Sequence, residues 1–125
     1  MVAHSLAVPL WLYVAANLTD NETVDRTLLV SPPSPNVLIR YDAVSAFATV
    51  PHHHDRVAAA AGTNRLVCSD NDPYCPEGGS IAYQELGLDC DIVPGGGHLD
   101  PDTGYGNWPS ALAWCRDPSI RLRPR

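Results

Sequence analysis

The stretch that decides the fold reads Asp91-Ile92-Val93-Pro94-Gly95-Gly96-Gly97-His98-Leu99-Asp100. A short apolar run stops at Pro94, and three glycines then leave the backbone free to bend. Glycine removes Cβ crowding and permits positive φ, so the backbone itself can aim the His98 side chain. A histidine held in this way can act as a base when a carboxylate binds one ring nitrogen and a nucleophile faces the other. The stretch therefore predicts a strand that ends in a catalytic histidine.

Two other stretches contain the groups that such a histidine needs. The apolar run Arg65–Ser69 leads into Asp70-Asn71-Asp72-Pro73, where the proline forbids continued strand pairing and makes a rigid acidic loop. Near the N-terminus, Ser5 lies among small residues and opens an apolar, helix-like stretch. Ser5, Asp72 and His98 follow one another in the order of the α/β-hydrolase triad, not in that of chymotrypsin or subtilisin. We therefore expect a nucleophile, an acid and a base at three strand ends.

The remaining segments predict strands that alternate with helices. Strands are expected over Thr27–Val30, Arg65–Ser69 and Leu88–Val93; helices over Ser5–Ala16, Glu77–Leu86 and Asn107–Cys115, with shorter ones over Ala43–Ala48 and ending at Ala58–Ala61; and a polar turn over Asn17–Glu22. Apolar runs without alternation, bounded by prolines, are typical of buried parallel strands. The pattern thus predicts an α/β fold with a parallel sheet, whose ligand sites lie at the carboxyl ends of the strands.

Composition limits the classes of protein that are possible. The chain has 125 residues, of which 45% are apolar and 18% charged, as expected for one small globular domain. Its net charge is −6 and it contains no lysine, so it offers no basic face for nucleic acid. The first apolar run, residues 6–16, includes Pro9 and is too short to cross a bilayer. We expect neither a nucleic-acid partner nor membrane association.

Cysteine usage favours a cytoplasmic protein. Four cysteines could form two disulfides, but no secretory signal precedes them, so reduced thiols are expected. Cys75 lies near the proposed acid, yet no second histidine in a triad context accompanies it as a base. His52-His53-His54-Asp55 could bind a metal, but adjacent histidines in an extended segment point in alternating directions. A solvated loop is the favoured interpretation there, and no metal or other cofactor is predicted.

With these residues considered together, the chain resembles the small serine hydrolases grouped around retinoblastoma-binding protein 9 and YdeN, which have the α/β-hydrolase fold. The matching pieces are His4-Ser5-Leu6, Leu28–Pro33, Ser69–Cys75, Gly97-His98-Leu99 and Gly104–Pro109. They extend through nearly the whole chain. The pieces around Asp72 and His98 are the more specific ones.

The resemblance implies a catalytic mechanism and the role of each residue. Ser5 would be the nucleophile, His98 the general base and acid, and Asp72, the aspartate directly before the proline, the carboxylate that orients the imidazole. The Leu6 N–H would be one donor to the oxyanion. The substrate would be a small ester, thioester or amide, held in an acyl pocket built partly by Pro32–Val50. The elbow departs from Gly-x-Ser-x-Gly, with Ala3 and Ala7 in place of the glycines.

The resemblance also predicts an incomplete domain. The family has several strands and helices before the nucleophile, including the strand that delivers the elbow and a loop that provides the other oxyanion N–H. This sequence begins almost at the elbow, and Met1 and Val2 are too few to replace these N-terminal strands. Residues 1–125 would thus form the C-terminal part of one α/β-hydrolase domain, with reduced activity and an exposed sheet edge open to self-association. A second interpretation is a catalytically inert remnant that acts as a binding or interaction module, and a third is a metal-binding protein.

Overall fold

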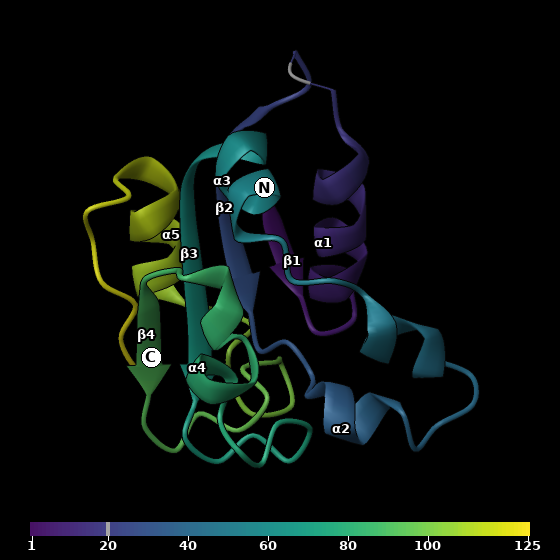
Figure 1. Cartoon of the computed structure of the whole chain (residues 1–125). Coiled ribbons are helices and arrows are strands. Elements are labelled where there is room, and N and C mark those ends of the chain that lie inside the picture. Colours follow the sequence, from purple (N-terminus) through teal and green to yellow (C-terminus); the bar gives the residue numbers. More distant parts are fainter. Residues whose placement is uncertain (20) are drawn as a thin grey trace.

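The computed structural model describes residues 1–19 and 21–125, and its centre is a parallel sheet with strand order β1-β2-β3-β4 (Figure 1). The strands are β1 (Val2–His4), β2 (Val24–Val30), β3 (Ala61–Ser69) and β4 (Cys90–Val93). The helices are α1 (Ala7–Asn17), α2 (Pro35–Leu38), α3 (His54–Ala60), α4 (Gly79–Ala82) and α5 (Pro109–Arg116), with 3-10 turns η1 (Ser45–Thr49) and η2 (Gln84–Leu86). The predicted α/β class and parallel sheet are confirmed.

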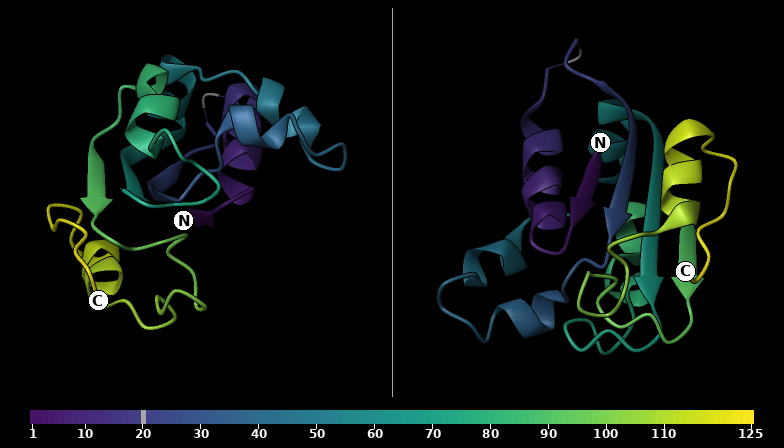
Figure 2. Two further views of the ribbon diagram at one scale, coloured as in Figure 1. Left: turned by 90° about the horizontal axis from the view of Figure 1, so that it is seen from below. Right: turned by 180° about the vertical axis from the view of Figure 1, so that it is seen from behind.

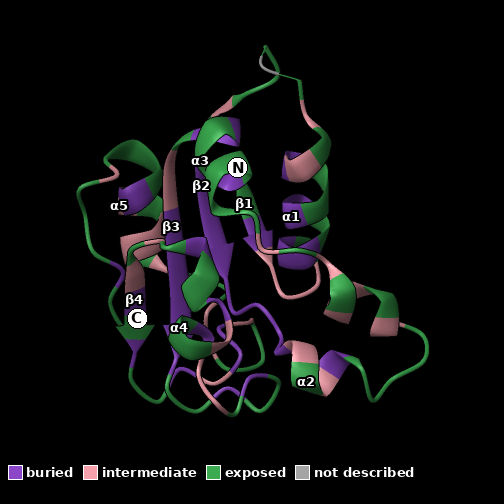
Figure 3. Cartoon of the chain, viewed as in Figure 1, coloured by how far each residue is buried: buried purple, intermediate pink, exposed green. Residues whose placement is uncertain are grey.

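Helices cover both faces of this sheet, as Figure 2 shows from below. Alternate residues along a strand point to opposite faces, so each strand contributes to two cores. Leu29 and Leu66 pack with α1 and α3 on one face. Their neighbours Leu28 and Val67 pack with Trp114 of α5 on the other. Figure 3 shows that the central strands β2 and β3 are buried over most of their length. The two layers hold the carboxyl ends of the strands in fixed relative positions.

The first strand was not expected from the sequence. Met1 and Val2 looked too few to form the strand that precedes the serine, but Val2–His4 pairs in parallel with β2, with Ala3 opposite Leu29. Three residues are too few to show the alternation of apolar and polar side chains that predicts a strand. Their extended conformation depends on the pairing with β2. In the described residues β1 pairs only with β2, so it lies at one edge of the sheet. Self-association through that edge stays a prediction.

Several helix boundaries differ from those predicted. The segment 77–86, predicted as one helix, forms α4 and η2 instead, because Gly78 has φ +87° and Glu77 uses its carboxylate to accept bonds from Ser34 and Asn36. Gly87 does end this segment, with φ +60°. Between Pro32 and Val50, α2 and η1 replace the single helix expected at 43–48. The turn predicted over Asn17–Glu22 includes Asp20, which lies outside the described residues.

The remaining predicted elements are present with shifted ends. Strands β2 and β3 begin earlier than predicted, whereas β4 begins at Cys90 rather than at residue 88. Helix α3 ends at Ala60, one residue before the predicted end, and the last helix runs from Pro109 to Arg116. Within residues 1–19 and 21–125, none of the helices has the length and apolar character needed to cross a membrane.

Candidate active site

Ser5 lies in a sharp turn between β1 and α1. Its φ of +56° is left-handed, a conformation that serine adopts only when its surroundings impose it. The Ser5 N–H donates to the carbonyl of Val30 at 2.9 Å, and the Ser5 carbonyl accepts from Val8 N–H at 2.9 Å. Both bonds hold the strained turn in place. The N-cap of α1 is Leu6 rather than Ser5, so the serine hydroxyl is not used as a helix cap.

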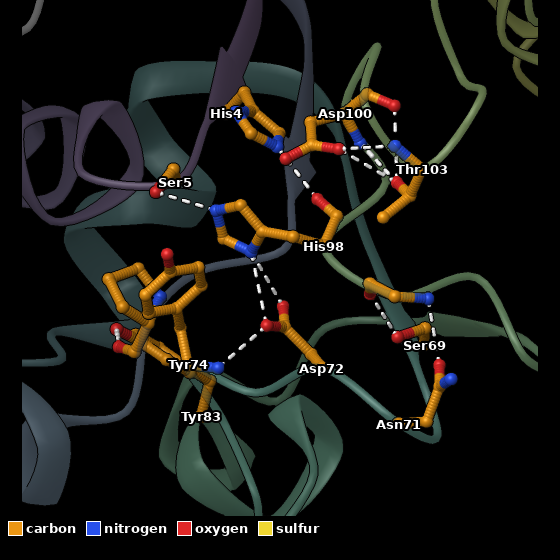
Figure 4. A network of polar contacts seen from close by, with 12 residues as sticks. His4, Ser5, Ser69, Asn71, Asp72, Tyr74, Tyr83, His98, Asp100 and Thr103 are labelled. Atoms are coloured by element: carbon orange, nitrogen blue, oxygen red, sulfur yellow. Dashed lines mark hydrogen bonds and ion pairs between the residues drawn. The ribbon is translucent and has the colours of Figure 1, made fainter.

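The Ser5 hydroxyl instead faces His98. His98 Nε2 lies 2.9 Å from Ser5 Oγ, and His98 Nδ1 lies 2.9 Å and 3.1 Å from the two carboxylate oxygens of Asp72 (Figure 4). A carboxylate accepts, so Nδ1 donates to Asp72 and the Nε2 lone pair is left to accept the Ser5 proton. His98 and Asp72 are buried, with 7% and 4% of their surface exposed, whereas Ser5 is half-buried. The structure thus brings together all three residues predicted from the sequence.

A loop that begins directly after β3 supports this arrangement. Asp72 Oδ1 accepts the N–H of Tyr74 at 2.9 Å, which fixes the carboxylate within its own turn. Asp70 Oδ1 accepts from Gly95 N–H and Asn71 Oδ1 accepts from Gly97 N–H, both at 2.7 Å. Ser69 Oγ also donates to the Gly97 carbonyl. Four consecutive residues, Ser69 to Asp72, therefore bind either the glycine loop or the histidine at its end.

Two aromatic rings and one hydrogen bond orient His98. The ring of Tyr74 lies edge-to-face with the imidazole, with ring centroids 4.6 Å apart, and the ring of His4 does the same at 4.8 Å. His4 Nε2 is 2.9 Å from the His98 carbonyl, to which it donates because a carbonyl can only accept. His4 is the residue directly before the serine, so the same turn that presents Ser5 also holds the backbone of His98.

The family resemblance implies that the Leu6 amide donates to an oxyanion. Leu6 directly follows Ser5 and opens the first turn of α1. Within residues 1–19 and 21–125, its N–H has no hydrogen-bond acceptor, whereas Ser5 and Val8 donate to carbonyls. The amide after the nucleophile is the position from which hydrolases of this fold stabilise a tetrahedral intermediate. The geometry is therefore compatible with the role that the sequence predicted for Leu6.

A cavity of about 460 Å³ opens beside Ser5 and His98. Its lining comes largely from the segment Pro32–Val50, which was expected to build part of an acyl pocket: Pro33, Val37, Leu38, Tyr41, Ala43 and Val44. Leu6, Tyr74 and Asp100 complete the lining. The volume falls in the range of pockets that bind small molecules. The candidate nucleophile thus lies at the side of a mostly apolar cavity.

The other side chains considered in the sequence lie elsewhere. Cys75 is buried, and burial, followed by the nearby carboxylates of Glu77 and Asp72, raises the pKa of its thiol to about 12. His52 stacks on Tyr83, and burial lowers its pKa, while His54 is in α3 beside Asp55. The four cysteines are free thiols. None of these side chains lines the cavity beside Ser5.

The residues that support the site were not predicted from the sequence. His4 was named only as part of a family-matching piece, and Ser69, Asp70 and Asn71 were given no catalytic or supporting role. The side chains of Asp and Asn at a strand end were a possible signal, because they commonly accept backbone N–H groups in loops. Their partners, Gly95 and Gly97, follow a different strand, and only the assembled sheet brings the two loops together.

A parallel sheet that places a serine, a histidine and an aspartate together at its carboxyl edge is characteristic of the α/β-hydrolase fold. The serine hydrolase family model matches residues 1–116, and the chain belongs to this family. Among solved structures, the ydeN gene product from B. subtilis matches with a TM-score of 0.77 and 22% sequence identity. The match covers 92% of this chain and 62% of that chain, so this chain spans less than two thirds of its length. No curated protein matches the chain.

These comparisons confirm the resemblance to YdeN-like small serine hydrolases and the fold class. Membership of the family, together with the fold, supports a hydrolase function.

Proposed function

We propose that the chain is a carboxylesterase-like serine hydrolase that cleaves a small ester, thioester or amide through an acyl-enzyme. The observation that carries this proposal is the unbroken series of hydrogen bonds from Ser5 Oγ through the His98 ring to the Asp72 carboxylate. A serine that merely packs in a turn needs no such partners. The adjoining apolar cavity would hold the substrate beside the serine.

In the first half of the reaction, Ser5 Oγ attacks the carbonyl carbon of the substrate while His98 Nε2 takes the hydroxyl proton. The Asp72 carboxylate stabilises the resulting imidazolium, to which it is already hydrogen-bonded. The tetrahedral intermediate carries its negative charge on the former carbonyl oxygen, where the Leu6 N–H would donate. When it collapses, the bond to the leaving group breaks, and Nε2 returns the proton to the departing alcohol, thiol or amine.

In the second half, water replaces the leaving group. His98 Nε2 takes a proton from the water, whose oxygen attacks the acyl carbon, and a second tetrahedral intermediate forms over the same N–H donor. Collapse breaks the bond to Ser5 Oγ, which regains its proton from Nε2, and the carboxylic acid leaves. All the groups in these steps come from this chain, the substrate and water.

Hydrolysis of 4-nitrophenyl acetate by the purified chain tests this proposal. Ser5→Ala should abolish turnover above the uncatalysed rate, because it removes the nucleophile. Ser80→Ala is the matched control, since Ser80 is exposed in α4 and does not line the cavity. Equal turnover by Ser5→Ala and the parent would exclude Ser5 as nucleophile. A folded parent chain that hydrolyses nothing would favour the inert binding module.

A further inference from the structure

The walls of the cavity beside Ser5 limit what can bind there. The segment from Pro33 to Val44 contributes only apolar side chains and the Tyr41 ring to the lining. Among the described residues, no arginine lines the cavity, so an anionic substrate group would find no cation there apart from a protonated His98. The transfer of an alkyl group from water to an apolar wall is favourable, whereas a charged group would find no hydrogen-bond partners there.

Asp100 adds a fixed negative charge to this lining. It lies two residues after His98, and its carboxylate oxygen Oδ1 accepts from the N–H and the hydroxyl of Thr103, both at 2.8 Å. Figure 4 shows its carboxylate next to the His4 ring. The two bonds from Thr103 lower the pKa of Asp100, so the carboxylate is ionised at neutral pH. The bonds from Thr103 to the Asp100 carboxylate are exposed to water, so the charge of this carboxylate acts over a short range only.

From this lining we infer that the pocket takes an uncharged alkyl acyl group of medium length, and that Asp100 is the residue that excludes acyl groups ending in a carboxylate. The inference rests on the proposed function, since it assigns the acyl side of the same reaction. It also orders the three proposed substrate classes. An ester or amide of an uncharged alcohol or amine is favoured over a thioester with a phosphorylated carrier, because the chain has a net charge of −6 and an acidic group at the site.

The test compares three esters that share one leaving group. They are 4-nitrophenyl acetate, 4-nitrophenyl hexanoate and the mono-4-nitrophenyl ester of adipic acid, which has the hexanoate chain length but ends in a carboxylate. For the parent chain, kcat/KM on the hexanoate should exceed that on the acetate by about tenfold or more, because four further methylenes are buried. It should exceed that on the adipate ester by at least about tenfold, because the distal carboxylate is desolvated near Asp100.

Two variants isolate the charge of Asp100. Asp100→Asn keeps an oxygen that can accept from Thr103. It should lower the ratio of kcat/KM on the hexanoate to kcat/KM on the adipate ester by about fivefold to tenfold. Asp102→Asn makes the same change in net charge at an exposed residue that does not line the cavity, and should leave the ratio unchanged. Equal rates on the acetate and the hexanoate would overturn the alkyl pocket. An unchanged ratio in Asp100→Asn would overturn the role of Asp100.

A binding measurement separates this inference from the proposed function. The Ser5→Ala variant, which cannot react, is titrated by calorimetry with hexanamide and with adipamate, its analogue with a terminal carboxylate. Preferential binding of hexanamide supports the pocket assignment even if the parent chain hydrolyses no ester, in which case only the proposed function fails. Equal binding of the two amides, or preference for adipamate, contradicts the inference even if ester hydrolysis by Ser5 is found.

Discussion

His98 Nε2 lies 2.9 Å from Ser5 Oγ, although 93 positions separate the two residues in the chain. Ser5 follows β1 at one edge of the sheet, and His98 follows β4 at the other, with β2 and β3 between them. The glycine loop after β4 must therefore reach back across the carboxyl ends of the strands. The geometry of the candidate site consequently depends on that loop and on the residues of the β3 loop that bind it.

Replacement of Asp72 by asparagine should lower kcat by about 10³ to 10⁴ and change KM little, because an amide no longer holds His98 in the tautomer that accepts the Ser5 proton. Steady-state ester hydrolysis measures both constants. Asp102→Asn, at an exposed position away from the cavity, is the matched control. A decrease of less than about fivefold would show that Asp72 is only a turn residue.

Asn71→Ala removes the acceptor of the Gly97 N–H and should lower kcat by about tenfold. Without this hydrogen bond, the glycine loop positions His98 less accurately. The Asn71→Asp variant keeps an acceptor oxygen at the same position, now a carboxylate oxygen, and we expect it to recover most of the activity. The kcat values of the two variants, with circular dichroism to verify folding, provide the comparison. Equal losses in both variants would contradict the proposed support.

Two glycine variants separate backbone strain from crowding. Gly95→Ala should lower the free energy of unfolding by about 1 kcal/mol, because φ is +66° but a new Cβ would meet nothing within 4 Å. At Gly97, φ is +59° and the Cβ would lie 2.6 Å from Thr103 Cγ2. Gly97→Ala should therefore lower the free energy of unfolding by about 2 to 3 kcal/mol and also reduce kcat. Urea denaturation measures both, and equal costs at the two sites would contradict this view of the loop.

Cys75 should resist alkylation in the folded protein. Its thiol has a pKa of about 12, so at pH 8 only about one molecule in 10⁴ carries the reactive thiolate, and the fraction rises with pH. Iodoacetamide at pH 8, followed by mass spectrometry, should modify the exposed Cys115 first. In urea, the difference between the two cysteines should disappear. Fast modification of Cys75 in the folded chain would make it a competing candidate for the nucleophile.

Asp72 and His98 were predictable from the sequence because each follows an apolar run that forms a strand. In a parallel sheet such strand ends meet at one edge, so these two side chains were expected close together. Ser5 was assigned instead from the chain order of the α/β-hydrolase triad and from the family resemblance, since no strand was predicted before it. The three glycines before His98 gave a further signal, since two of them, Gly95 and Gly97, adopt positive φ.

The residues that support the site were not predictable in the same way. An aspartate or asparagine in a loop can accept from its own turn, as Asp72 does from Tyr74, or from a distant loop, as Asn71 does from Gly97. Residue type does not distinguish these outcomes, which depend on the packing of two loops. The strand β1 and the helix α2 were missed because neither is long enough to repeat the pattern of apolar residues by which strands and helices are recognised.

The most direct test of the central claim is covalent labelling with a fluorophosphonate, with the modified residue identified by peptide mass spectrometry. The reagent phosphonylates a serine only when a base activates its hydroxyl, as His98 is placed to do for Ser5. We predict labelling of Ser5 in the parent chain and in Ser80→Ala, with none in Ser5→Ala and a large reduction in His98→Ala. A folded parent chain that is not labelled, or is labelled at another serine, would contradict the account.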